Sequence, residues 1–115
     1  MEARQQAPRG SFFQLNGLVL SLFSRERLAE DAQVSPEGSG FPGVVLAYNA
    51  RSRDDVDAVL AEAERAGARI LKPAQDVFWG GYSGYFADLD GHFWEVAWNP
   101  EWELGPEGNV RMNCT

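Results

Sequence analysis

Residues 84–100 read GYFADLDGHFWEVAWNP, and this stretch decides the fold. Two apolar, aromatic-rich runs flank a turn at 89–91, where Asp and Gly adopt the backbone angles of tight turns easily. The runs predict strands at 85–88 and 92–98. The stretch therefore predicts a β-hairpin.

A second hairpin of the same pattern lies near the start of the chain. Residues 12–23 read FFQLNGLVLSLF, in which an aromatic pair precedes Leu-Asn-Gly and an apolar run. Asn-Gly favours a two-residue turn, so we expect strands at 12–15 and 18–23. The match between the two stretches indicates either an internal repeat or a chance likeness of two common hairpins.

The segment between the hairpins predicts a strand and a helix. Residues 44–50 are apolar enough for a strand. Ser52 is placed to cap a helix, apolar residues recur at helical spacing through 56–66, and Gly67 ends the pattern. With a further strand at 69–72, the second part of the chain reads β-α-β-β-β.

The chain reads as one structural domain, because 115 residues suit a single hydrophobic core. Its first part lacks the strand and helix that open the second part. This difference predicts an unpaired sheet edge and an uncovered apolar face. We divide the chain into a disordered or extended segment at 1–10, a partial first unit at 11–34, a linker at 35–43, a complete unit at 44–98 and an irregular tail at 99–115.

Composition and charge exclude several classes of protein. Hydrophobic residues make up 44% of the chain, which is typical of a globular protein. The formal charge of −7 argues against nucleic acid and anionic membranes as partners. Cys114 is the only cysteine, and no apolar run is long enough for a membrane span or signal core. We expect a soluble, cytoplasmic protein.

The stretch at 84–100, the helix SRDDVDAVLAEAERAGA and the following strand RILKPAQ resemble the vicinal oxygen chelate superfamily. This superfamily includes glyoxalase I, bleomycin-resistance proteins and extradiol dioxygenases. The resemblance covers about residues 12–100 and implies an α+β fold of paired βαβββ modules, in which a curved mixed sheet surrounds a cavity. The first module lacks its opening strand and helix. Truncation or a late start of the sequence would explain this, and so would a module that another chain completes.

Metal-dependent members of this superfamily take ligands from the first and last strands of each module. The resemblance assigns one such position to Glu95, four residues after Gly91. The matching residue of the first module is Ser21, a poor ligand for a divalent ion, and 44–50 holds no histidine or carboxylate. Glu95 is thus a single metal candidate in an incomplete set. We expect no cofactor, with a divalent metal as the alternative.

Glu95 is also the candidate catalytic residue, on condition that the protein is an enzyme. A carboxylate among apolar neighbours must be paired, protonated or metal-bound, unless it faces water at an edge. Strand alternation places His92 on the opposite face, where we interpret it as a turn or surface residue. Asp88 and Asp90 are interpreted as turn residues, because the glycine position does not fit a calcium loop.

The function expected first is the binding of a small, partly apolar molecule in a cavity without a complete metal site. The alternatives are a metal-dependent lyase or dioxygenase that uses Glu95, and a dimeric scaffold with a vestigial cavity. A homodimer is expected, because another chain can cover the open edge. The candidate ligand-binding residues are Trp79, Tyr82, Tyr85 and Phe93, which core packing would explain equally well, together with the polar Asn49 and Ser21.

Overall fold

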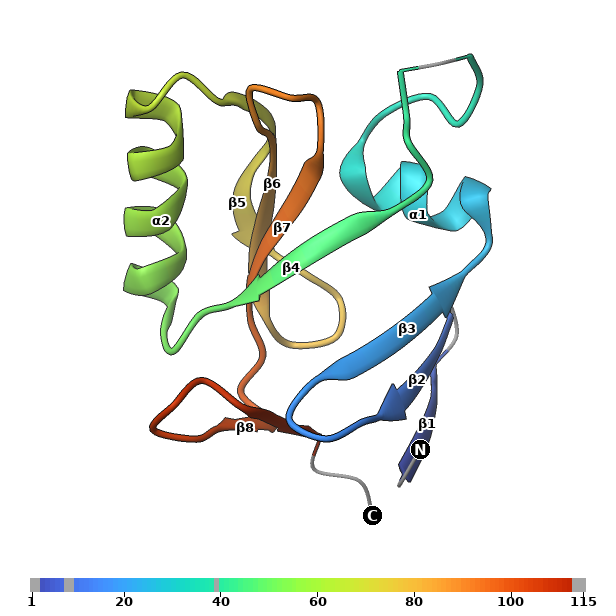
Figure 1. Ribbon diagram of the computed structural model, residues 1–115, viewed down its shortest axis with the longest axis vertical. Helices are drawn as coiled ribbons and strands as arrows, with labels where there is room; N and C mark the ends of the chain where they lie inside the picture. The colour runs from blue at the N-terminus through green and yellow to red at the C-terminus, as the bar shows by residue number, and fades with distance from the viewer. Residues whose placement is uncertain (1–2, 8–9, 39, 113–115) are drawn as a thin grey trace.

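The computed structural model describes residues 3–7, 10–38 and 40–112, with side chains from residue 10 onward. Its first sheet is antiparallel and has the order β1-β2-β3 (Figure 1). These strands are β1 (Ala3–Ala7), β2 (Gly10–Gln14) and β3 (Val19–Phe23). The predicted hairpin near the start of the chain is therefore confirmed, and β1 extends it by one strand.

The second sheet has the order β4-β7-β6-β5, with β4 parallel to β7 and the other pairs antiparallel. Helix α2 (Arg53–Arg65) connects β4 to β5, which gives the predicted β-α-β-β-β order. The hairpin predicted from 84–100 is the β6–β7 pair. The strands are β4 (Val45–Asn49), β5 (Arg69–Asp76), β6 (Tyr82–Ala87) and β7 (Phe93–Trp98).

Helix α2 covers one face of the second sheet, here called the outer face (Figure 1). The Ser52 hydroxyl accepts a hydrogen bond from the Asp55 N–H at 3.1 Å, so the predicted cap is confirmed. Beyond the helix, Gly67 adopts a φ of +104°, which favours glycine. The apolar stripe of α2 packs through Val56 and Leu60, which are buried against the sheet.

Helix α1 (Arg25–Ala32) packs on the opposite, inner face of the same sheet (Figure 1). Ser24 caps its first turn. Its buried alanines contact a cluster that includes Tyr85 and Phe93 of the sheet. Among the described residues, neither helix is long and apolar enough to cross a membrane.

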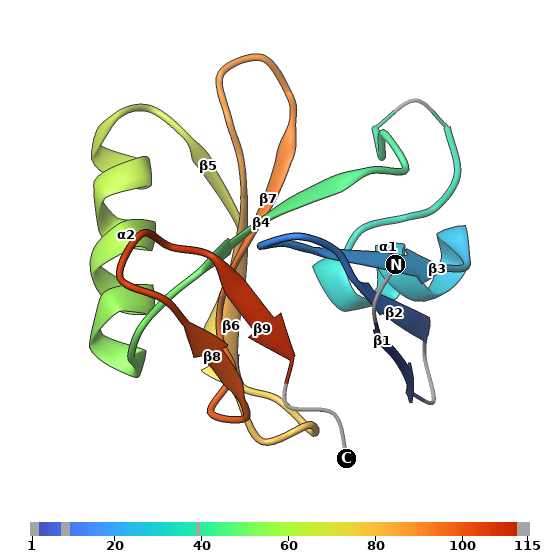
Figure 2. The ribbon, with the colours of Figure 1, turned by 60° about the horizontal axis from the view of Figure 1, so that its bottom comes forward.

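The expectation of an irregular tail is wrong for residues 102–112. Strands β8 (Trp102–Leu104) and β9 (Val110–Met112) form an antiparallel hairpin (Figure 2). Each is only three residues long, too short to show a strand period in the sequence. Cys114 lies outside the described residues.

The two sheets repeat one arrangement incompletely. The order β1-β2-β3 of the first sheet matches β5-β6-β7 of the second, with an antiparallel hairpin at its end. In the second sheet β4 pairs with the edge of β7 that faces away from β6. The described chain places no strand beside the corresponding edge of β3, the one that faces away from β2. The structure thus confirms an α+β fold whose first module lacks its opening strand and helix.

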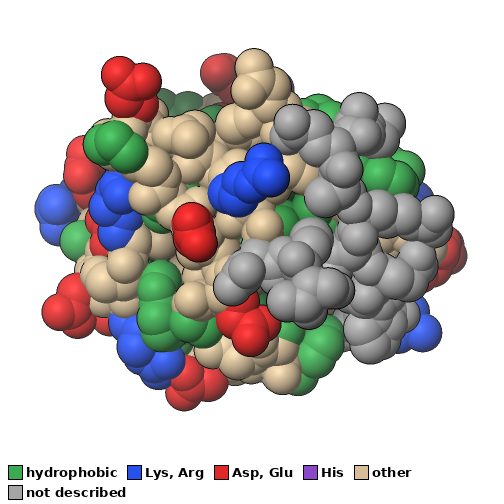
Figure 3. Space-filling model, turned by 90° about the horizontal axis from the view of Figure 1, so that it is seen from below, with side chains coloured by type: hydrophobic (Ala, Val, Ile, Leu, Met, Phe, Trp, Pro, Cys, Tyr) green, Lys and Arg blue, Asp and Glu red, His purple; other side chains and the backbone are tan. Residues whose placement is uncertain are grey.

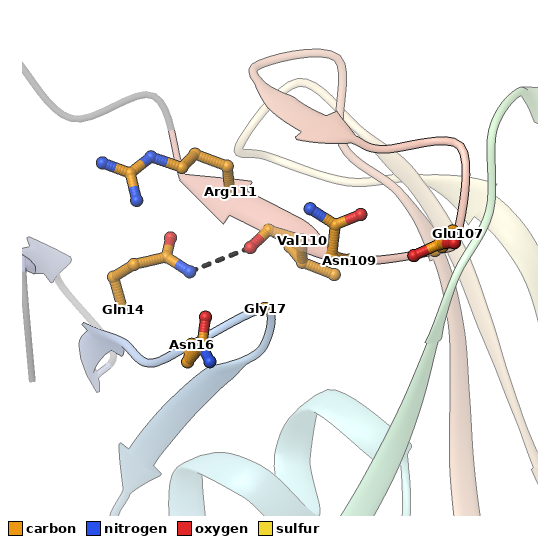
Figure 4. A pocket seen from close by; sticks show the side chains of 8 residues that line it. Gln14, Asn16, Gly17, Glu107, Asn109, Val110 and Arg111 are labelled. Atoms are coloured by element: carbon orange, nitrogen blue, oxygen red, sulfur yellow. Dashed lines mark hydrogen bonds between the residues drawn. The ribbon is translucent and has the colours of Figure 1, made fainter.

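Gln14 joins the C-terminal hairpin to the first sheet. Its side chain is 2% exposed, and its amide Nε2 donates to the Val110 carbonyl at 2.8 Å (Figure 4). Its Oε1 accepts the Met112 N–H at 2.7 Å. A second contact runs from the Val110 N–H to the Gly17 carbonyl. These bonds fix β9 against the β2–β3 turn.

We expect Gln14→Ala to lower the free energy of unfolding by about 2–3 kcal/mol, because it leaves buried backbone groups of Val110 and Met112 unpaired. Chemical denaturation followed by tryptophan fluorescence measures the change. Gln75→Ala is the matched control, since this exposed side chain makes only a local contact to the Pro73 carbonyl. Equal losses in the two variants would contradict the assigned role of Gln14.

Candidate functional site

Glu95 lies on β7 and faces the inner side of the second sheet. In the strand register its neighbours are Ala47 on β4 and Tyr85 on β6. Ala47 is exposed, Glu95 is partly buried and Tyr85 is 1% exposed. The carboxyl group therefore stands between a buried aromatic wall and an open, small-residue wall.

A set of polar side chains from three elements surrounds Glu95 on the buried side. Asp31 of α1 accepts a hydrogen bond from the Tyr85 hydroxyl. Lys72 of β5, which is 5% exposed, donates to the Asp31 main-chain carbonyl at 3.1 Å. Its Nζ lies 3.8 Å from the Asp31 carboxylate. The ammonium group and the phenol thus hold the end of α1 on the inner face.

The surroundings of Glu95 favour its protonated form. Burial and the negative charge of Asp31 raise the pKa of Glu95 to about 7, against the opposing effects of Lys72 and Ser83. Burial, followed by the charges of Glu95 and Asp31, also raises the pKa of Tyr85. Near neutral pH the Glu95 carboxyl group can accordingly donate or accept a hydrogen bond.

Ser83 adds a buried hydroxyl group to this site. Its side chain is 1% exposed, and no hydrogen bond of ordinary geometry joins its Oγ to another described residue. It lies on β6 opposite Ala97, close enough to Glu95 for its hydroxyl to act as a hydrogen-bond donor that lowers the pKa of that carboxyl group. Buried hydroxyls normally find a partner, and Glu95 is the partner within reach.

Three of the sequence-predicted site residues share the inner face with Glu95. Tyr85 and Phe93 are buried there under α1 and the segment that follows it. Asn49, at the end of β4, is partly buried and pairs with Ala97 in the register. The two aromatic residues are core residues in this chain, and Asn49 borders the open side of the face.

The structure places the other predicted residues away from Glu95. Tyr82 faces α2, where its hydroxyl donates to Asp57 at 2.8 Å. Trp79 lies in the β5–β6 loop against Gly81, at a distance that leaves no room for a side chain there. Ser21 is exposed on β3 of the first sheet. These three residues therefore do not join the site.

Sequence reasoning missed Asp31, Lys72 and Ser83. Asp31 read as one of several acidic residues in a short helix, and Lys72 and Ser83 lay in strand-like segments. Only the packing of α1 on the inner face brings Asp31 to Lys72, and no local sequence motif predicts that contact.

Asp88 stabilises the turn before β7 through hydrogen bonds of its side chain. Asp88 Oδ1 accepts the N–H groups of Asp90 and His92 at 3.0 and 2.9 Å, and Oδ2 accepts the Trp94 indole N–H at 3.0 Å. The Trp94 hydrogen bond chiefly holds the pKa of Asp88 below its usual range. His92 precedes β7, is exposed and lies 3.5 Å from Asp88. These contacts support the interpretation of Asp88 as a turn residue.

A groove of about 670 Å³ lies at the other end of the molecule, between the β2–β3 turn and β9 (Figure 4). On this face, charged side chains of both signs are scattered among hydrophobic ones (Figure 3). No residue predicted to line a cavity borders this groove. Its lining consists of Gln14, Asn16, Gly17, Glu107, Gly108, Asn109, Val110 and Arg111.

The comparisons with known proteins agree with this architecture. The family model of the glyoxalase/bleomycin resistance protein/dioxygenase superfamily matches residues 1–96. The chain belongs to this superfamily. A search of curated proteins found no match.

Two solved structures are similar to this chain. A glyoxalase-related enzyme from Fulvimarina pelagi is 37% identical, with a TM-score of 0.62 over 96% of this chain and 78% of its own. A Legionella pneumophila structure, described as an NAD-dependent benzaldehyde dehydrogenase, has a TM-score of 0.61 at 20% identity, over 82% of this chain and 75% of its own. The second likeness shows the fold alone.

The residues around Glu95 do not fit the divalent metal that the superfamily often uses. The register partner of Glu95 on β4 is Ala47, which offers no ligand atom. The Lys72 ammonium group lies close enough to lower the pKa of Glu95 and would repel a cation. Asp88, Asp90 and His92 bring ligand atoms within 4.8 Å of one another, but both Asp88 oxygens already accept hydrogen bonds.

We expect the purified protein to retain no stoichiometric Zn²⁺, Ni²⁺, Mn²⁺ or Fe²⁺ after incubation and dialysis, because the described residues form no group of three potential ligands that includes Glu95. Elemental analysis of protein prepared without chelators or a metal-affinity tag makes the measurement. Asp88→Asn is the control for loose binding at the turn. Stoichiometric metal that disappears in Glu95→Gln would contradict this expectation.

Glu95→Gln should also change how stability depends on pH. In the native protein, Glu95 keeps its proton up to about pH 7, whereas the unfolded chain loses it near its ordinary value of 4.5. The free energy of unfolding of the native protein therefore decreases as the pH rises from about 4.5 to about 7. The glutamine variant has no carboxyl group at this position and lacks this decrease. We expect the variant to gain roughly 1–3 kcal/mol relative to the native protein between pH 4.5 and 7.

Denaturant titrations at several pH values measure this difference. Glu103→Gln is the matched control for the loss of one carboxylate, since Glu103 is exposed on β8. A pH-independent difference between Glu95→Gln and the native protein would show that Glu95 ionises alike in the folded and unfolded chains.

Proposed function

We propose that this protein binds a small organic molecule at Glu95 on the inner face of the second sheet, without a divalent metal. The observation that supports the proposal is a partly buried carboxyl group, whose pKa is about 7, with the buried Ser83 hydroxyl beside it on the same face. Polar groups with unused hydrogen-bonding capacity beside an apolar wall are typical of ligand sites.

The entrance to the proposed site is on the β4 side. Ala47 and Ala97 have small side chains that flank the carboxyl group, and Ala47 is exposed. Asn49 supplies an amide at the border of this opening. On the other side, α1 and the buried Tyr85 close the face. A molecule that approaches over β4 would bring its polar end toward Glu95.

The chemistry of the site favours a ligand with a carbonyl or phenolic oxygen. A protonated Glu95 is a hydrogen-bond donor, and a ligand oxygen can accept from it. Lys72 is already engaged with Asp31, so it does not supply a free charge to the ligand. We expect binding to weaken as the pH rises above about 7, because Glu95 then loses its donor.

The test is an NMR screen of ¹⁵N-labelled protein with uncharged fragments that carry a ketone, amide or phenol. We expect binding fragments to shift the amide resonances of β4 and β7 near Ala47 and Glu95. Ala47→Trp should weaken this binding at least tenfold, because the indole fills the entrance. Ala58→Trp, at an exposed position on α2, is the matched control.

Two results would overturn the proposal. One is fragment binding that is equally strong in Ala47→Trp and the native protein. The other is binding confined to the groove beside Asn16 and Asn109, which would place the ligand at the opposite end of the molecule.

A further inference from the structure

The turn between β2 and β3 contains one peptide bond that its surroundings do not hold. On either side of it the chain is fixed, because the Leu15 N–H donates to the Leu18 carbonyl at 2.8 Å. The Gln14 side chain also donates to both of their carbonyls, at 2.9 and 3.3 Å. Between these anchors, the Asn16 carbonyl and the Gly17 N–H have no hydrogen-bond partner among the described residues. This single peptide unit is therefore free to rotate.

The Asn16 side chain is equally unrestrained. It is exposed along the polar groove, and no hydrogen bond joins its carboxamide to another residue of the described chain (Figure 4). The next residue, Gly17, has a φ of +84° and no side chain that would hinder an approach to its nitrogen. Rotation about the bonds of Asn16 can thus bring its carboxamide carbon to the Gly17 nitrogen.

The turn between β6 and β7, which repeats this pattern, holds the equivalent nitrogen in place. Gly91 has a similar φ of +85°, but its N–H donates to the Asp88 carbonyl at 3.0 Å. The N–H of Asp90 donates to the Asp88 carboxylate at 3.0 Å. The nitrogen of the turn glycine is therefore occupied in one hairpin and free in the other.

The other asparagines of the described chain are followed by nitrogens that are hydrogen-bonded or lack a hydrogen. The N–H groups of Ala50 and Val110 donate to main-chain carbonyls at 2.7 and 2.8 Å, and Pro100 has no N–H. Within residues 10–38 and 40–112, Asn16 is thus the one asparagine whose following N–H is both present and free. The three others are Asn49, Asn99 and Asn109.

We propose that Asn16 is a site of spontaneous deamidation, with water as the co-reactant. The Gly17 nitrogen attacks the Asn16 side-chain carbon and closes a succinimide ring. The bond from that carbon to Nδ2 breaks, and the proton of the Gly17 N–H leaves with Nδ2 as ammonia. Water then opens the ring at one of its two carbonyl carbons and restores the N–H. Opening gives aspartate or isoaspartate, in which the main chain runs through the former side chain.

The reaction would loosen the attachment of the C-terminal hairpin. The Gly17 carbonyl accepts the Val110 N–H at 2.8 Å, and Gln14 binds the turn and β9 at the same time. Isoaspartate lengthens the main chain by one carbon atom between these contacts. Either product also adds a negative charge to a groove that Glu107 already lines, and like charges repel. This effect is independent of ligand binding at Glu95.

The test is incubation of the purified full chain at mildly alkaline pH, followed by peptide mapping with mass spectrometry that distinguishes isoaspartate from aspartate. We expect conversion at Asn16 to be at least tenfold faster than at the other described asparagines, which corresponds to a barrier lower by about 1.4 kcal/mol. Gly17→Ala should slow it, because the added methyl group hinders the attack. Gly91→Ala is the matched control, since it places alanine at the same positive φ in the other hairpin.

Hydrogen exchange measures the consequence for β9. In the incubated native protein, the Val110 and Met112 amides should exchange faster, whereas those of β5 should not change. Asn16→Ser removes the carboxamide and keeps a small polar residue that turns accept. After the same incubation this variant should show no change at β9.

Three outcomes would overturn the proposal. The first is an intact Asn16 in the folded chain under conditions that deamidate a synthetic peptide of residues 10–22, because the fold would then protect the turn. The second is earlier conversion of another described asparagine. The third is conversion of Asn16 with exchange at Val110 equal to that of the incubated Asn16→Ser variant, which would show that β9 does not depend on this turn.

Discussion

The packing of α1 on the inner face of the second sheet is the contact on which the site depends. Two alanines of α1 are fully buried there, so the helix approaches the sheet closely. This approach brings Asp31 to Lys72 and Tyr85, which hold it by hydrogen bonds and an ion pair. The same approach places a second negative charge near Glu95 and contributes to its raised pKa.

The surroundings of Glu95 also do not form a complete metal site in the described residues. Strand β7 carries the Glu95 carboxyl group, yet the adjacent strand β4 places an alanine opposite it and the polar surroundings include Lys72. A carboxyl group whose pKa is raised toward neutrality by burial and by Asp31, with a lysine close by, suits hydrogen bonding better than coordination of a cation. Strand β7 therefore fixes where the Glu95 carboxyl group lies, while its neighbours decide its chemistry.

The unequal modules have a second consequence, at the surface. The first sheet packs one face against the C-terminal hairpin, to which Gln14 connects it, and leaves Leu20 and Leu22 of β3 exposed. The second sheet has helices on both faces. One repeated hairpin thus forms part of a core in one sheet and an accessible surface in the other, because only one of them has its strand and helix in the described chain.

The sequence by itself determined the repeated hairpins, the capped helix α2, the superfamily and the position of Glu95. Each of these rests on local signals: turn residues, a cap, a helical apolar period and a glycine at a fixed distance from a strand carboxylate. The sequence also placed Tyr82 with Tyr85 as a ligand-binding candidate, although their odd separation puts them on opposite faces of β6. Strand alternation was the signal that could have separated them.

Only the tertiary structure decided what surrounds Glu95. Asp31, Lys72 and Ser83 come from three separate elements. The orientation of a short helix on a sheet cannot be predicted from a periodic pattern in the sequence. The same holds for β8 and β9, whose three-residue strands are fixed by hydrogen bonds to Gln14, nearly a hundred residues away in the chain. Local patterns fix elements, whereas contacts between distant elements are fixed by packing in three dimensions.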